Sequence, residues 1–157
     1  ATIDNQHKTV IDLLKHPLKH SLHIVGRLDL NSSGLLLLTN DSAWSRKLMQ
    51  PERKVEKIYQ VKTAKPISHE CIDAFKQGMY FPYENITTKP VELNIKSEYT
   101  AELRLIEGKY HQIKRMFGRY RNPVLEIHRS AIGEIHLDPM LQVGESRLLS
   151  DSEVGSI

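Results

Sequence analysis

Residues 26–41 read GRLDLNSSGLLLLTND, a charged loop that runs directly into four consecutive leucines. Turn-forming residues flank the leucines on both sides, at 31–34 and at 39–41. Four apolar residues between two turn signals are typical of a short strand buried on both faces. Gly34 supplies the backbone freedom that a change of chain direction needs. We therefore expect Asp29 to lie on a tight loop anchored by an interior strand, a suitable place for a catalytic carboxylate.

Short strands and helices alternate on either side of this loop. Alternating apolar residues predict strands at 22–25, 55–63, 124–128 and 132–137, and a hairpin made of 89–96 and 100–106. Helices are expected at 9–14, at 43–49 after a cap at Asp41 or Ser42, at 70–77 between a Ser68 cap and Gly78, at about 110–120, and as a turn at 151–153. Short connections and hairpins favour an α+β fold with a mixed, mostly antiparallel sheet and flanking helices.

The composition limits the classes of protein that the chain can represent. Its 157 residues fit one domain, and no apolar run approaches the length of a membrane span. The single cysteine, Cys71, excludes an internal disulfide and favours a reducing compartment, so we expect a cytoplasmic protein. We interpret Cys71 as a buried, unreactive thiol rather than a nucleophile, and we expect a monomer.

Positive charge is concentrated in one segment, although the net charge is only +3. Residues 109–121 contain five cations and no acid: Lys109, Lys114, Arg115, Arg119 and Arg121. Such a block suggests a polyanionic partner, and a solvated helix face remains the alternative.

The same segment contains EGKYHQIKRMF, residues 107–117, which has the period of an amphipathic helix. On a helix, one face collects Ile113, Met116, Phe117 and Tyr120, which predicts a core-facing side. The opposite face carries His111, Arg115 and Arg119, and Lys114 lies at the border between the two. A lysine at such a border can pack its stem against apolar neighbours and turn its ammonium toward a carboxylate.

The GRLD loop, its short Ser turn, the leucine run and Thr-Asn-Asp together resemble the signature of RNA pseudouridine synthases. The similarity is greatest to the RsuA-like branch, which contains the small-subunit ribosomal enzyme. It implies the pseudouridine synthase fold with a central active-site cleft. It also implies that Asp29 is the catalytic aspartate, that Lys114 is the cation beside it with Arg115 as the fallback, and that Tyr59 lies over the target base.

The resemblance further implies the reaction and the substrate. Pseudouridine formation breaks a glycosidic carbon–nitrogen bond, rotates the uracil and rejoins it through carbon, and it needs no cofactor. The expected partner is ribosomal RNA, either 16S rRNA or a small-subunit assembly intermediate. Substrate contacts are expected from Arg27, Lys109, His111, Arg115 and Arg119. No metal is expected, because the spacing of His16, His20 and His23 matches no usual ligand set.

The family usually begins with a small RNA-binding domain and a Lys-Pro-x-Gly segment, and neither is visible in this sequence. We therefore expect residues 1–157 to be a catalytic domain that lacks its N-terminal part and an upstream S4-like domain. Two other classes stay open. One is a non-catalytic RNA-binding module, and the other is a hydrolase that pairs Asp29 with Asp41 about 5–9.5 Å apart.

Overall fold

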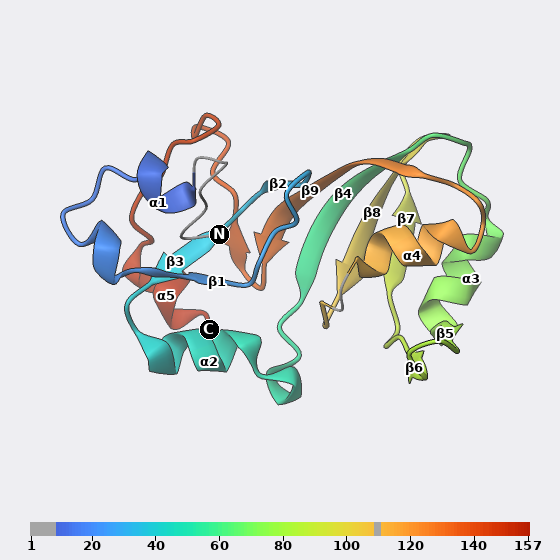
Figure 1. Ribbon diagram of the computed structural model, residues 1–157, viewed down its shortest axis with the longest axis horizontal. Coiled ribbons are helices and arrows are strands. Elements are labelled where there is room, and N and C mark those ends of the chain that lie inside the picture. The colour runs from blue at the N-terminus through green and yellow to red at the C-terminus, as the bar shows by residue number, and fades with distance from the viewer. Residues whose placement is uncertain (1–8, 109–110) are drawn as a thin grey trace.

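The computed structural model describes residues 9–108 and 111–157. The α-helices are α1 (Val10–Leu13), α2 (Ser42–Met49), α3 (Glu70–Gln77), α4 (Gln112–Gly118) and α5 (Asp151–Gly155), and 3-10 turns occur at Lys19–Ser21 and Pro51–Arg53. The strands are β1 (His23–Val25), β2 (Ser33–Gly34), β3 (Leu37–Thr39), β4 (Lys57–Thr63), β5 (Tyr80–Phe81), β6 (Ile86–Thr87), β7 (Glu92–Ile95), β8 (Thr100–Leu105), β9 (Val124–Ile132) and β10 (Ile135–His136). Figure 1 shows two neighbouring parts, with the long strand β9 passing from one to the other.

The main sheet has the strand order β10-β9-β4-β8-β7, and every pair along this path is antiparallel. β2 joins β9 in a short parallel pair, while β1 pairs with β3 and β5 with β6 in separate antiparallel ladders. The predicted α+β class with a mixed, mostly antiparallel sheet is therefore confirmed. The hairpin predicted from 89–96 and 100–106 is β7–β8.

One face of the main sheet carries α3 and α4, as Figure 1 shows. The inward residues of β8 and the apolar face of α4 meet there in the larger of two cores. Ile113, Met116 and Phe117 are buried as their helical spacing predicts, and the ring of Phe117 meets Phe75 of α3 edge to face at 5.0 Å. Burying each such side chain contributes roughly 1.5–3 kcal/mol. This packing fixes α4, and with it the basic segment, against the sheet.

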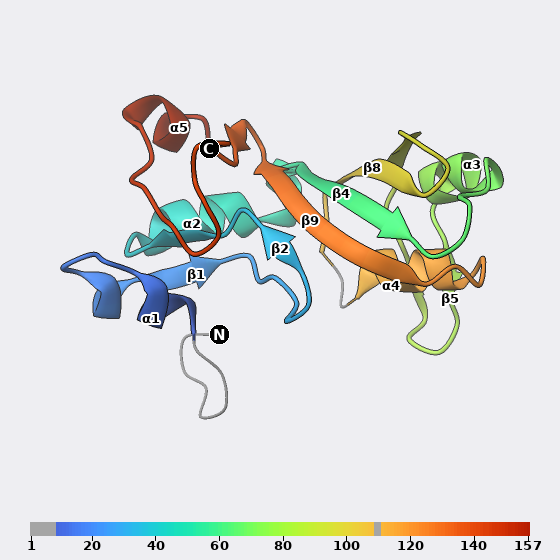
Figure 2. The same ribbon diagram turned by 90° about the horizontal axis from the view of Figure 1, so that it is seen from above.

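The smaller core lies where β1, β3 and α2 meet the far end of β9. Its buried members include Val25, Leu37 and Leu48, together with Ile132 and Ile135. The last residues of the chain pack against the same core and return the C-terminus to this part of the molecule (Figure 2).

The leucine run differs from the predicted strand buried on both faces. Leu35 and Leu37 are buried, whereas Leu36 and Leu38 are half-buried, and β3 begins only at Leu37. Side chains alternate between the faces of a strand, and in the described residues β3 pairs only with β1. A two-stranded sheet with one face on the core leaves its other face partly open, so a continuous apolar run gives alternating burial.

Local signals placed most other element ends correctly. The Asp41 carboxylate accepts hydrogen bonds from the Ala43 and Trp44 amides and caps α2, and Gly78 ends α3 in the left-handed region at φ +92°. The Ser68 prediction is wrong by one residue. The Ser68 hydroxyl accepts a hydrogen bond from the Glu70 amide, but the N-cap position of α3 is His69, whose side chain forms no capping hydrogen bond.

The strands predicted at 124–128 and 132–137 are divided differently in the structure. β9 continues to Ile132, which pairs with Lys57, and Gly133 then turns the chain at φ +58° into β10. Pairing along β4 therefore extends β9 beyond its apolar pattern. None of the helices in the described ranges is long and apolar enough to cross a membrane.

Candidate active site

The loop that carries Asp29 is fixed at both ends by one arginine of β9, Arg129. This side chain is only 1 % exposed, and it donates to three main-chain carbonyls. Its Nε donates to Leu35 at 2.9 Å, its Nη1 to Arg27 at 3.3 Å and its Nη2 to Gly26 at 3.1 Å. Because a planar guanidinium has donors in fixed directions, one side chain holds both the start and the end of the loop.

Main-chain pairing between β2 and β9 reinforces this attachment. The Leu35 amide donates to the Arg129 carbonyl at 2.7 Å, and Gly34 lies opposite Arg129 in the parallel pair. A Cβ on Gly34 would lie 2.1 Å from the Arg129 carbonyl oxygen, and Gly34 has φ +115°. Only glycine fits at position 34. The glycine that the sequence pattern assigned to a turn is thus required because two backbones approach each other closely.

Asp29 lies close to the start of α4, although the two belong to distant segments of the chain. The loop turns tightly, with the Ser32 amide donating to the Asp29 carbonyl at 2.9 Å. The Asp29 Oδ2 lies 3.7 Å from the His111 Nε2, and both side chains are partly exposed. His111 has φ +48°, an uncommon conformation for a residue other than glycine and one that concentrates at functional sites. A protonated His111 would form an ion pair with Asp29.

Lys114 lies on the same side of α4 as this meeting point. It lines a small cavity of about 280 Å³ together with Asn31, two residues after Asp29, and with residues 124–127 of β9. In the part of the chain that the structure describes, no ion pair joins Lys114 to Asp29. The basic side chain found beside Asp29 is instead that of His111, and the pairing of Lys114 with Asp29 stays a prediction.

Tyr59 and Arg27 flank the base of the loop. Tyr59 lies opposite Arg129 in the antiparallel pair of β4 and β9, so both side chains belong to one face of the sheet. Tyr59 is half-buried and packs against the larger core. Arg27 is exposed, and its carbonyl is one of the acceptors of Arg129. The sheet thus brings Tyr59 to the strand position beside the residue that holds the Asp29 loop.

The other expected RNA contacts extend along α4 away from Asp29. Arg115 and Arg119 lie about one and two turns beyond His111 and face the β5–β6 hairpin, where Arg115 forms an ion pair with Glu84. Lys109, which was also expected to bind substrate, lies outside the described residues. His111, Arg115 and Arg119 therefore form a line along α4 that starts beside Asp29.

Two cations lie close together below the loop. Burial, and to a smaller extent the charge of Arg129, lower the pKa of Lys57. In residues 9–108 and 111–157, neither Lys57 nor Arg129 forms an ion pair with a carboxylate. The charge of Arg129 is instead balanced by the three main-chain carbonyls to which it donates.

Arg129 is absent from the residues that the sequence predicts for this site. One signal was available in the strand pattern. The inward positions at this end of β9 are Ile127, Arg129 and Ala131, and a buried arginine must find hydrogen-bond acceptors. Which acceptors it finds could not be read from the sequence, because they lie about a hundred residues away.

The paired-carboxylate alternative gains no support from the geometry, since Asp41 serves as the cap of α2. Among the described residues, no group of three or more His, Cys, Asp or Glu side chains is arranged to hold a metal ion. Cys71 is buried as expected, and burial raises the pKa of its thiol to about 11. A thiol with that pKa is protonated at neutral pH and a poor nucleophile.

Known proteins resemble this chain in sequence and in fold. Residues 1–118 match the family described as RNA pseudouridylate synthase. The ribosomal small subunit pseudouridine synthase A of Pseudomonas aeruginosa is 47 % identical over all of this chain and 68 % of that protein. The proteins of the same name from Vibrio cholerae and Escherichia coli are 42 % and 38 % identical, over 98 % and 100 % of this chain and 67 % and 68 % of their own lengths.

A crystal structure of a pseudouridylate synthase superimposes with a TM-score of 0.93 at 38 % identity, over 97 % of this chain and 66 % of that one. The chain thus spans about two thirds of the length of the relatives it matches. Their similarity runs through the Asp29 loop, β4 and α4 alike, and the fold agrees over nearly the whole chain. This chain therefore belongs to the RNA pseudouridylate synthase family, whose members are isomerases that act on RNA.

Proposed function

We propose that this chain is the catalytic domain of an enzyme that converts one uridine of small-subunit ribosomal RNA, the 16S rRNA, to pseudouridine. The observation that carries the proposal is the attachment of the Asp29 loop. Arg129 holds both ends of that loop while its tip meets His111 at the start of α4. A carboxylate on a rigidly held loop is positioned for chemistry on a bound nucleotide. The names of the relatives support the choice of RNA.

Each residue of the site has a distinct part in the proposed reaction. Asp29, as the carboxylate, attacks the sugar or removes a proton from it when the bond from ribose to the uracil nitrogen breaks. The detached uracil rotates and rejoins through a carbon atom, which then loses its proton while the nitrogen released from the ribose gains one, so the reaction is an isomerisation. Tyr59 stacks on the base, since a flipped-out base needs an aromatic surface to offset its lost stacking.

Basic side chains around Asp29 hold the RNA in place in this proposal. Lys114 enters as the catalytic cation, because it lines the cavity that Asn31 shares with it. His111 lies nearer to Asp29 and contacts the substrate. Arg27, Lys109, Arg115 and Arg119 complete the proposed contacts and bind phosphate without reading sequence.

The whole protein is proposed to be longer than this chain. The relatives extend beyond the matched region by about a third of their length. We propose an upstream S4-like RNA-binding domain, a monomeric state and a cytoplasmic location. The RNA partner is free 16S rRNA or an assembly intermediate of the small subunit.

The test is single-turnover conversion of unmodified 16S rRNA by the full-length protein, with pseudouridine mapped by chemical sequencing. Asp29→Asn keeps the side-chain volume but removes the charge, so conversion should fall by at least about 10³-fold. The RNA dissociation constant and the urea midpoint should stay within about twofold of wild type. Lys114→Met should also reduce the conversion rate much more than the affinity.

The outcomes separate the proposal from its competitor. A non-catalytic RNA-binding module would bind 16S rRNA, convert none of it, and be indifferent to Asp29→Asn. Conversion by Asp29→Asn at a rate near wild type would refute the assignment of the carboxylate. If His111→Ala rather than Lys114→Met abolished turnover, the catalytic cation would be reassigned to His111.

A further inference from the structure

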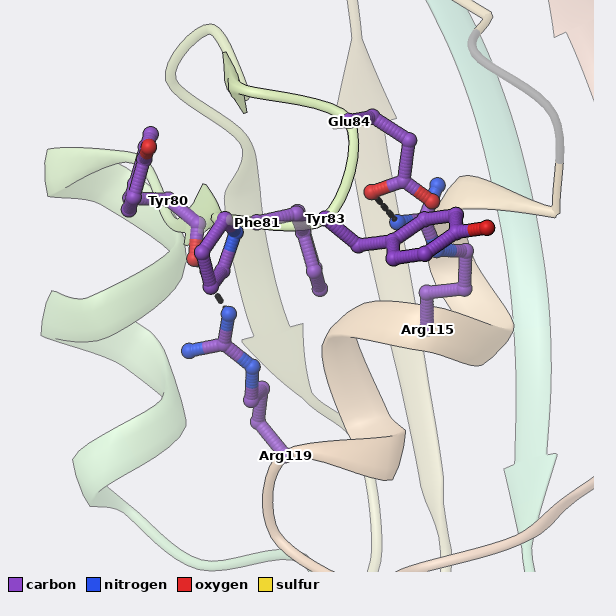
Figure 3. A pocket seen from close by; sticks show the side chains of 7 residues that line it. Tyr80, Phe81, Tyr83, Glu84, Arg115 and Arg119 are labelled. Atoms are coloured by element: carbon purple, nitrogen blue, oxygen red, sulfur yellow. Dashed lines mark hydrogen bonds and ion pairs between the residues drawn. The ribbon is translucent and has the colours of Figure 1, made fainter.

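A second feature lies beyond the Asp29 loop, where the β5–β6 hairpin faces α4. Residues 80–84 of the hairpin, together with Arg115 and Arg119, line a hollow of about 690 Å³. Figure 3 shows Arg115 and Arg119 reaching toward the hairpin from α4, while the Tyr80 ring points away from the Phe81 ring and the two arginines. Tyr83, in the turn between the two strands, is 97 % exposed, and Tyr80 is 50 % exposed. A tyrosine as open as Tyr83 contributes little to the fold, so its ring is available to an external ligand.

The two arginines are held in place by the hairpin. The guanidinium carbons of Arg115 and Arg119 lie 4.5 and 4.6 Å from the ring centroid of Phe81. Arg119 also donates to the Tyr80 carbonyl, and Arg115 pairs with Glu84 (Figure 3). Cation–π contacts and hydrogen bonds therefore preorganise two cations on the side of the hairpin that carries Phe81 and the exposed ring of Tyr83.

Aromatic rings interleaved with arginines are the combination that binds single-stranded RNA. Every base has a flat face that stacks on an aromatic side chain, and guanidinium groups contact phosphate. The hollow carries two positive charges against the single carboxylate of Glu84. Its charge and its rings together match a nucleotide better than an apolar peptide or a second copy of this chain.

The position of the hollow relative to Asp29 indicates which nucleotide it would take. His111, Arg115 and Arg119 follow one another at intervals of four residues, and His111 lies 3.7 Å from Asp29. At 1.5 Å per residue, Arg119 lies about 12 Å along the helix from His111. That distance corresponds to a few nucleotides of an RNA strand that follows α4 away from the catalytic carboxylate.

We propose that this hollow binds an unpaired nucleotide of the RNA substrate, a few positions from the target uridine, with its base stacked on Tyr83 and its phosphate on Arg119, because Arg115 is already paired with Glu84. The inference rests on the proposed function, because it takes Asp29 as the position of the target. It adds a binding site that lies outside the catalytic loop and helps to select the RNA conformation that presents the target.

The test measures binding of the full-length protein to unmodified 16S rRNA, beside its single-turnover rate at saturating RNA. Tyr83→Ala should weaken binding about five- to a hundredfold, while the rate at saturation stays at the wild-type value. Tyr83→Phe keeps the ring and should bind like wild type. Tyr99→Ala is the matched control, since Tyr99 is also exposed but lies in the turn between β7 and β8. Arg119→Met should lower the slope of log affinity against log salt by about 0.7.

A photo-crosslinking amino acid at position 83 locates the nucleotide. The crosslink should map within a few nucleotides of the uridine that the enzyme converts. An unchanged affinity in Tyr83→Ala, the same loss in Tyr99→Ala, an unchanged salt slope in Arg119→Met, or a crosslink far from the target would each overturn the proposal. Its failure is distinct from failure of the proposed function, which would appear as absent conversion by the wild-type protein.

Discussion

Arg129 shows how much of this site depends on a single side chain. A buried charge without a carboxylate partner is costly, and here three main-chain carbonyls offset that cost. Those carbonyls belong to the two ends of the Asp29 loop, so the same hydrogen bonds that satisfy Arg129 also fix the carboxylate. Arg129 touches no reacting group in this arrangement, and we regard it as a positioning residue.

Replacement of Arg129 by lysine tests this role. A lysine keeps the charge but cannot reach three separated carbonyls in the fixed geometry of a guanidinium. Arg129→Lys should lower the free energy of unfolding by about 1–3 kcal/mol and the single-turnover rate at saturating RNA by at least about tenfold, with RNA affinity nearly unchanged. Urea unfolding and rapid-quench assays below the unfolding transition give both values. If Arg129→Lys were destabilised but reacted at the wild-type rate, Arg129 would have a purely structural role.

At the scale of the elements, the loop is held by a pair of strands, β2 and β9, that is only two residues long. β2 has two residues, and its parallel pairing with β9 brings Gly34 against the backbone of Arg129. This contact fixes the spacing between the smaller core and the sheet. It exists only because position 34 has no side chain.

Gly34→Ala should therefore lower the free energy of unfolding by more than its unfavourable backbone dihedral angle alone would. The added methyl group would lie 2.1 Å from the Arg129 carbonyl oxygen, so β2 must separate from β9 and lose the bond from the Leu35 amide. Gly144→Ala is the matched control, since Gly144 also has a positive φ, +84°, but nothing lies within 4 Å of its Cβ position. We expect a loss of at least about 2 kcal/mol for Gly34→Ala and about 1 kcal/mol for Gly144→Ala in urea unfolding. Equal losses would show that only the dihedral angle matters.

At the scale of the whole molecule, the C-terminal segment closes the smaller core. The Trp44 indole of α2 donates to the Val154 carbonyl of α5 at 3.1 Å, and Ile157 packs against the same core. Arg147 holds α5 from outside with two hydrogen bonds to Glu153, at 2.8 and 2.9 Å. These hydrogen bonds from Arg147 lower the pKa of Glu153 from 4.5 to about 2.

The packing of α5 against the smaller core should weaken at acidic pH. The pKa of Glu153 is lower in the folded than in the unfolded state, so its ionised form stabilises the folded protein. This contribution to the free energy of unfolding is fully present above about pH 4.5 and is lost as the pH falls toward about 2. Trp44 is the only tryptophan in the sequence, so its emission reports the contact with α5. An acid titration should show an emission change in this window that Glu153→Gln removes. If Glu153→Gln showed the same emission change, the change would have to come from the titration of another group.

The sequence by itself determined what depends on near neighbours along the chain. The helical period near residues 110–120, the cap at Asp41 or Ser42 and the glycine at the end of α3 act over a few residues. The structure confirms a helix at Gln112–Gly118, the cap at Asp41 and the end of α3 at Gly78. The motif around Asp29 indicated the family before any contact was known, and the family matches confirm it.

The tertiary structure alone decided which distant groups meet. Arg129 bonds carbonyls that lie 94 to 103 residues away, Asp29 meets His111 from another segment, and Arg115 turns to Glu84 of the hairpin. The burial of alternate leucines in the run before Thr39 was likewise set by the absence of a second partner for β3 in the described residues. A local pattern fixes which face of an element is apolar, whereas the partner of each polar group depends on how strands far apart in sequence pair and pack. That is the physical reason why the Asp29 loop could be located from the sequence and the arginine that holds it could not.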